Sequence, residues 1–126
     1  MSKTLILIPS RLSATRLPGK PLLKINNLSI ISHVVKKAKQ TKIGEVYVAA
    51  EDQEIVDDVK KNGGQAILTS NRHKTGTDRS FECFKKINIK DVEYIINLKG
   101  EEPNIDIDDI IKLNTLVIKI KHKLEP

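Results

Sequence analysis

The 126-residue chain has one cysteine, no tryptophan and only four aromatic side chains, two tyrosines and two phenylalanines. A lone cysteine, Cys83, excludes an internal disulfide framework and a multi-cysteine zinc site, and it suits a reducing compartment. The scarcity of aromatics argues against a protein that stacks RNA bases on aromatic platforms. Apolar runs such as 5–8 are far shorter than the ~20 residues that cross a bilayer. We therefore expect a cytoplasmic protein without membrane insertion, in which Cys83 is a packed small residue.

Positive charge is in modest excess: the chain has 22 Lys and Arg against 16 Asp and Glu, a net charge of +6. The excess is mostly lysine spread along the chain, so a solvated surface explains it better than a nucleic-acid interface, and a basic nucleic-acid-binding domain is the weakest interpretation. A small polyanion is a better-fitting partner. Arginine is rare, and its four positions fall in only two segments of the chain: Arg11, Arg16, Arg72 and Arg79.

The organisation of the chain predicts one domain, residues 1–126, because no repeat or linker divides it. Short apolar runs rich in β-branched residues alternate with segments of helical periodicity. We expect strands at 5–8, 46–50, 66–69 and 94–98, and helices capped by Ser29, by Asp52 and by Thr77 or Asp78, with a last helix from about Asp106. This order predicts an α/β fold, a mainly parallel sheet with helices on both faces. In such sheets the ligand crevice lies at the carboxyl ends of the strands.

The loop after the first strand carries an unusual set of side chains. Residues 9–21 contain three cations, three hydroxyl groups and a glycine between prolines: Arg11, Arg16 and Lys20; Ser10, Ser13 and Thr15; and Gly19. A triphosphate bears about four negative charges and needs several fixed donors, which arginine, lysine and backbone amides supply. The spacing is not that of a Walker A loop. An exposed basic turn is the alternative interpretation.

Two further loops leave the predicted carboxyl edge. Residues 71–79 end at a helix start, where free amides favour an anion or a polar base edge, although a simple capped loop would look the same. Residues 97–103 follow a buried strand, and a carboxylate there, Glu101, could hold Mg²⁺ against substrate phosphates. The alternative for Glu101 and Glu102 is a solvated acidic turn.

Three ordered motifs together resemble a known family. The segments are Ile8-Pro9-Ser10-Arg11 leading into Ser13 to Leu22, then His73 to Arg79, then Asn97 with Gly100-Glu101-Glu102-Pro103. They resemble 3-deoxy-manno-octulosonate cytidylyltransferases, the CMP-Kdo synthetases of lipopolysaccharide synthesis. The resemblance implies a Rossmann-like nucleotidyltransferase domain that binds CTP, Mg²⁺ and the sugar acid Kdo. In such an enzyme the anomeric hydroxyl of Kdo attacks the α-phosphate of CTP, giving CMP-Kdo and pyrophosphate.

The resemblance also implies roles for particular residues. Side chains of the first loop would bind and neutralise the triphosphate, with Arg11 and Lys20 as the catalytic pair; the second loop would line the cytidine, and one carboxylate would hold the metal. The residues are Arg11, Ser13, Thr15, Arg16 and Lys20 for the triphosphate, Thr75, Gly76, Thr77 and Arg79 for the cytidine, and Glu101 for Mg²⁺. Phosphoryl-type transfer depends on positioning and charge stabilisation, so we expect no protein nucleophile.

Some positions depart from the family pattern. The family usually has Gln-Gly-Asp-Glu-Pro where this chain has Lys99 to Pro103, so the metal-binding carboxylate has a longer arm and a lysine beside it. The chain corresponds to the N-terminal half of family members, and residues 118–126 look like an altered or frayed end. The sequence leaves open whether the chain is active alone or is a non-catalytic nucleotide-binding remnant or partner module. It also leaves open a homodimer or another association through an open sheet edge.

Overall fold

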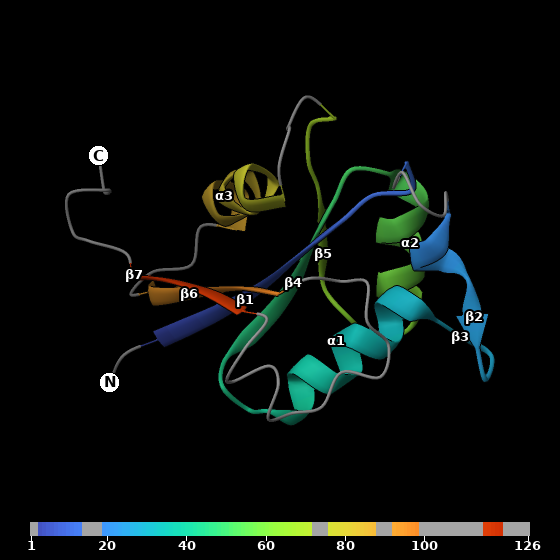
Figure 1. Cartoon of the computed structure of the whole chain (residues 1–126), viewed down its shortest axis with the longest axis horizontal. Coiled ribbons are helices and arrows are strands. Elements are labelled where there is room, and N and C mark those ends of the chain that lie inside the picture. Colours follow the sequence, from blue (N-terminus) through green and yellow to red (C-terminus); the bar gives the residue numbers. More distant parts are fainter. Residues whose placement is uncertain (1–2, 14–18, 72–75, 88–91, 99–114, 120–126) are drawn as a thin grey trace.

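The structure is a computed structural model of the chain, and it describes residues 3–13, 19–71, 76–87, 92–98 and 115–119 (Figure 1). Helices and strands alternate along most of this length. In chain order they are β1 (Lys3–Ser10), a 3₁₀ helix η1 (Lys20–Leu22), β2 (Lys24–Ile25), β3 (Leu28–Ser29), α1 (Ile30–Gln40), β4 (Glu45–Ala50), α2 (Gln53–Lys61), β5 (Ala66–Leu68), α3 (Gly76–Ile87), β6 (Val92–Leu98) and β7 (Thr115–Lys119).

One five-stranded sheet forms the centre, in the order β5-β4-β1-β6-β7. The first four strands are parallel, and β7 runs antiparallel to β6. At the middle of β1, Ile6 lies opposite Val46 of β4 and Ile96 of β6. The four predicted strands and the mainly parallel sheet are confirmed.

Helices cover both faces of this sheet, as predicted: α1 and α2 lie on one side and α3 on the other (Figure 1). Alternate residues of β1 serve the two faces. Ile6 and Ile8 pack in the cluster with α1 and α2, whereas Leu5 and Leu7 pack in the cluster that contains Cys83 of α3. A strand buried on both faces has to be apolar throughout, which explains the unbroken run at 5–8.

The first two helices begin where the sequence predicts. Ser29 caps α1, its Oγ accepting a hydrogen bond from the Ser32 amide at 3.2 Å. Asp52 stands at the N-cap position of α2, yet its side chain makes no capping bond there. The prediction for Asp52 is therefore right about position and wrong about the bond, because the carboxylate is engaged elsewhere. Asn62 ends α2, followed by Gly63 with a φ of 87°, a left-handed conformation that favours glycine.

The third helix differs from its prediction at the start. It begins at Gly76, so Thr77 and Asp78 lie inside its first turn and neither is the cap that the sequence suggested. Phe81 and Phe84 are both half-buried, and Phe84 packs against the apolar cluster that contains Cys83. Cys83 is fully buried, which confirms its packed role.

A short hairpin that was not predicted from the sequence follows η1. Strands β2 and β3 pair antiparallel, with Ile25 opposite Leu28. Between them Asn26 and Asn27 have φ values of 53° and 66°. Two consecutive left-handed residues make the tight turn that joins hairpin strands, and asparagine tolerates this conformation better than most residues. The Asn-Asn pair was the available signal for this hairpin.

The other unexpected element is β7, whose last residues belong to the stretch interpreted as an altered or frayed end. Residues 118 and 119 instead pair with β6, so they are not frayed. The helix predicted from Asp106 lies outside the described residues. None of the helices in the described ranges has the length and apolar composition that crossing a membrane requires.

Candidate functional site

The carboxyl ends of β1, β4, β5 and β6 meet at one edge of the sheet, because the four strands are parallel. From β1 the chain moves outward to β4 and β5, then returns across the sheet to β6 on the other side of β1. This reversal is the topological switch point at which open α/β sheets bind ligands. The three loops singled out in the sequence therefore begin near this edge, as predicted.

The loop after β1 is closed by hydrogen bonds at its base. The Gly19 amide donates to the Leu12 carbonyl at 2.8 Å, and the Leu12 amide donates to Asp52 Oδ2 at 2.8 Å. Gly19 has a φ of 80°, so a glycine is needed for backbone conformation at this closure. Leu12 and Leu22 pack against the core cluster of α1 and α2. The two ends of the loop are thus anchored to the body of the domain.

Two of the residues predicted to bind the triphosphate flank the hydrogen bond between Gly19 and Leu12. Arg11 precedes Leu12 and Lys20 follows Gly19, and both are partly exposed; Ser13 is exposed. Thr15 and Arg16 lie outside the described residues. The structure therefore brings two cations to the base of one closed loop at the carboxyl edge.

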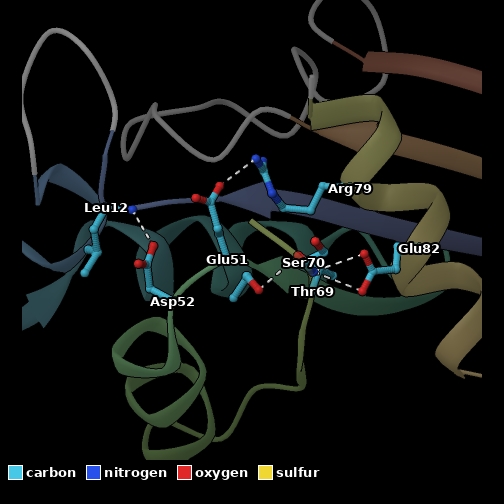
Figure 2. Close-up of polar contacts among 8 residues, drawn as sticks. Leu12, Glu51, Asp52, Thr69, Ser70, Arg79 and Glu82 are labelled. Atoms are coloured by element: carbon cyan, nitrogen blue, oxygen red, sulfur yellow. Dashed lines mark hydrogen bonds and ion pairs between the residues drawn. The ribbon is translucent and has the colours of Figure 1, made fainter. Parts of the chain in front are cut away.

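Hydrogen bonds fix Thr69 and Ser70, the first two residues after β5 (Figure 2). The Thr69 amide and hydroxyl both donate to the Ala50 carbonyl, at 2.7 and 3.1 Å. The Ser70 amide donates to both carboxylate oxygens of Glu82 at 3.0 Å, and Lys86 pairs with the same carboxylate at 2.9 Å. These bonds tie the end of β5 to the middle of α3. Of the predicted cytidine residues, Gly76 and Thr77 begin α3 and Thr75 lies outside the described residues.

Arg79 makes a buried ion pair that the sequence did not reveal. Its Nη2 lies 3.0 Å from Glu51 Oε2, with 4% of the arginine side chain and 14% of the glutamate side chain exposed (Figure 2). Its Nε is buried without a hydrogen-bond partner within the described part of the chain. Glu51 directly follows β4, and its amide donates to the Ser10 carbonyl at 3.0 Å. The guanidinium group is therefore fixed near the carboxyl ends of β4 and β1.

Sequence reasoning passed over the loop after β4, which supplies Glu51 and Asp52. The available signal was two consecutive carboxylates directly after a buried strand, at the same edge as the basic loop. The sequence predicts Asp52 only as a helix cap and assigns no role to Glu51. Their partners lie 40 and 28 residues away, so only the folded chain brings these groups together.

The third predicted loop is represented by its first residues. The Ser80 hydroxyl donates to Asn97 Oδ1 at 2.5 Å and joins α3 to the end of β6. Glu101, the predicted metal ligand, lies outside the described residues. Within the ranges that are described, no group of three or more His, Cys, Asp or Glu side chains could hold a metal ion. The two carboxylates at the edge, Glu51 and Asp52, are engaged by Arg79 and by a backbone amide.

Comparison with known proteins decides the family. Residues 5–116 match the family model described as cytidylyltransferase. The chain belongs to the cytidylyltransferase family. It is 46% identical over 110 residues to a 3-deoxy-manno-octulosonate cytidylyltransferase of Rhodopseudomonas palustris, and 44% identical over 109 residues to one of Rickettsia bellii. Each alignment covers 86% of this chain and 45% of the relative, so the chain spans about half the length of these relatives.

Solved structures agree with this cytidylyltransferase assignment. A CMP:2-keto-3-deoxy-manno-octonic acid synthetase complexed with CTP superposes with a TM-score of 0.80 at 42% identity, covering 89% of this chain and 46% of that one. A cytidylyltransferase from Leptospira borgpetersenii gives 0.68 at 30% identity, covering 86% and 45%. The predicted nucleotidyltransferase fold and the resemblance to the N-terminal half of CMP-Kdo synthetases are confirmed.

Proposed function

We propose that this cytidylyltransferase chain binds CTP and transfers CMP to Kdo, releasing pyrophosphate, as part of lipopolysaccharide synthesis. The observation that carries the proposal is the 44–46% identity, over 86% of the chain, to relatives named for that activity. In the reaction the anomeric oxygen of Kdo forms a bond to the α-phosphorus of CTP and loses its proton. The bond from that phosphorus to the bridging oxygen breaks, and pyrophosphate leaves.

The loop after β1 has the properties that a triphosphate site needs. Arg11 and Lys20 stand on either side of its closed base, and Ser13, Thr15 and Arg16 lie between them in the sequence. Arg11 and Lys20 would stabilise the charge that builds on the leaving pyrophosphate, which is the main catalytic demand of such a transfer. The side chains of Ser13, Thr15 and Arg16 would complete the phosphate contacts.

The start of α3 is the proposed cytidine side. The first backbone amides of a helix have no partners within it and can donate to a polar base edge or a phosphate. Gly76 and Thr77 occupy this first turn, and Thr75 precedes it in the sequence. Arg79 follows Thr77 by two residues in α3. The ion pair with Glu51 holds the buried Arg79 guanidinium near the carboxyl ends of β4 and β1.

The proposal that the chain binds magnesium rests on the sequence alone. The described residues do not make a metal site, and Glu101, which follows β6 by three residues, is the proposed ligand. Mg²⁺ usually takes one or two protein carboxylates and completes its shell with phosphate oxygens and water, so one carboxylate suffices. When bound, the ion would neutralise charge on the triphosphate. We also infer a cytoplasmic location, and association through an open sheet edge, as a homodimer or with another subunit.

The direct test measures pyrophosphate released by the purified chain with CTP, Mg²⁺ and Kdo. Release that requires all three is the expected result. The sequence also favours a second candidate, a non-catalytic nucleotide-binding module, because Lys99 places a cation beside the proposed metal ligand. CTP binding without pyrophosphate release, unchanged in Glu101→Ala, would support the second candidate. Absence of both binding and release would contradict both.

A further inference from the structure

The turn that follows β4 holds two loops of the proposed site at once. Asp52 Oδ2 accepts a hydrogen bond from the Leu12 amide at 2.8 Å, and Glu51 Oε2 accepts one from Arg79 Nη2 at 3.0 Å (Figure 2). Consecutive residues therefore anchor the loop after β1 and the helix after β5. We propose that Glu51 and Asp52, here called the acidic bracket, are positioning residues that set the separation of these two parts of the nucleotide site.

The carboxylate of Asp52 fixes the base of the loop after β1. Its carboxylate holds the N–H of Leu12, while the C=O of the same residue accepts from the Gly19 amide at 2.8 Å. Both polar groups of Leu12 are thus held, and the cations Arg11 and Lys20 are the immediate neighbours of the two closing residues. Donors that are already in place lose little entropy when a ligand binds, so a fixed loop raises affinity.

The ion pair of Glu51 fixes α3 at the carboxyl edge of the sheet. Buried charges need partners, and the Arg79 side chain is only 4% exposed. Arg79 lies in the first part of α3, so the ion pair holds the amino end of that helix beside β4. The backbone adds to this anchorage, because the Glu51 amide donates to Ser10 and the Thr69 amide donates to the Ala50 carbonyl. These backbone bonds join the ends of β1, β4 and β5 next to the bracket.

The charge of the bracket supports a positioning role over a binding role. A carboxylate that faced a triphosphate would repel it, whereas here each carboxylate is occupied by a donor of the protein. This inference rests on the proposed function, because it assumes that CTP binds at the carboxyl edge. It adds two residues to the site that contact no nucleotide yet govern its affinity.

The test compares CTP affinities of four variants by calorimetry in the presence of Mg²⁺, at a temperature where circular dichroism shows each to be folded. Asp52→Ala removes the acceptor, and Asp52→Asn keeps an acceptor oxygen. Glu51→Gln removes the charge that pairs with Arg79. Glu54→Gln, an exposed carboxylate in the first turn of α2, is the matched control.

We expect Asp52→Ala, which loses a hydrogen bond, and Glu51→Gln, which leaves the buried Arg79 without a counter-charge, each to weaken CTP binding about tenfold, or ~1.4 kcal/mol. Asp52→Asn should restore most of the affinity, and Glu54→Gln should bind as the unchanged chain does. A role in stability alone predicts lower melting temperatures with CTP affinity intact in the folded protein. That result would overturn the proposal.

Amide hydrogen exchange, followed by NMR without nucleotide, separates the inference from the proposed function. Asp52→Ala should speed exchange at the Leu12 and Gly19 amides, and Asp52→Asn should slow it again. Unchanged exchange in Asp52→Ala would overturn the anchoring of the loop, whatever CTP does. If the unchanged chain does not bind CTP while exchange depends on Asp52 as expected, the proposed function fails and the anchoring stands.

Discussion

At the scale of single residues, Lys20 is a cation of the proposed site whose backbone contacts are defined. It follows Gly19 at the closure of the loop after β1, and its own carbonyl accepts from the Leu23 amide. Truncating the side chain therefore leaves the backbone of the loop intact. This separation makes Lys20 suitable for a test of charge alone.

Lys20→Ala should weaken CTP binding by roughly 10- to 100-fold, because a charge-assisted contact with phosphate contributes about 1.5–3 kcal/mol. The matched control is Lys24→Ala, an exposed lysine of β2. Calorimetric titration with CTP measures both variants. Equal losses in the two would assign the effect to net charge, against a specific contact for Lys20.

Cys83 makes the stability of the folded chain depend on pH in the alkaline range. Burial raises the pKa of its thiol from 9.0 to about 12, with Glu82 adding to the rise and Lys86 opposing it. Above pH 9 the unfolded chain loses this proton while the folded chain keeps it. The contribution to stability is complete below pH 9 and is lost as the pH rises toward 12, by at most about 1.4 kcal/mol per pH unit.

Urea unfolding across that range checks this prediction. The free energy of unfolding should fall more steeply with pH in the unchanged chain than in Cys83→Ala, which lacks the titrating group. The comparison of slopes also removes the effect of lysines that titrate in the same range. Parallel slopes would show that the thiol has its ordinary pKa in the folded protein.

The residues of the proposed site were only partly predictable. The basic loop is local in sequence, so its cations and its glycine could be recognised before folding. Glu51 could not be assigned, because an acidic residue after a strand has many ordinary explanations and its partner Arg79 lies 28 residues away. The bond from Leu12 to Asp52 was hidden for the same reason, since it joins a backbone amide to a side chain 40 residues later.

At the scale of elements, a polar network joins the start of α1 to the end of α2. Asp58 accepts hydrogen bonds from the hydroxyls of Ser29 and Ser32, the second at 3.1 Å, and Asn62 donates to Ser32 Oγ at 3.4 Å. Ser29 and Ser32 are 1% and 3% exposed. The network thus satisfies buried hydroxyl groups where two helices meet.

Asp58→Ala should lower the free energy of unfolding by about 2–3 kcal/mol, because it leaves two buried hydroxyls without their acceptor. Asp57→Ala is the control, an exposed neighbour on the same helix whose carboxylate accepts from Gln53, and it should cost less than about 0.5 kcal/mol. Urea denaturation compares the two. Equal losses would contradict a specific role for the network.

Elements with strong local patterns were predicted well, and those that depend on distant pairing were not. The apolar positions of α1 recur at helical spacing after a serine cap, and the helix forms there. Strand β7 needed knowledge of its partner, because it exists as an antiparallel addition to β6. The helix α3 begins at Gly76, ahead of both predicted caps, Thr77 and Asp78.

At the scale of the whole molecule, the topology explains why so few residues define the site. The four parallel strands end at the same edge, and the return of the chain from β5 to β6 separates two sets of loops there. The basic loop, the acidic bracket and the first turn of α3 all lie at that edge. A chain about half as long as its cytidylyltransferase relatives thus holds three parts of the proposed nucleotide site on one sheet.

The most direct test of this account is a calorimetric titration of the chain with CTP in the presence of Mg²⁺. The account predicts saturable binding of one CTP per chain, weakened by added salt because charged contacts dominate. A folded protein that shows no saturable heat with CTP at millimolar concentrations would contradict it.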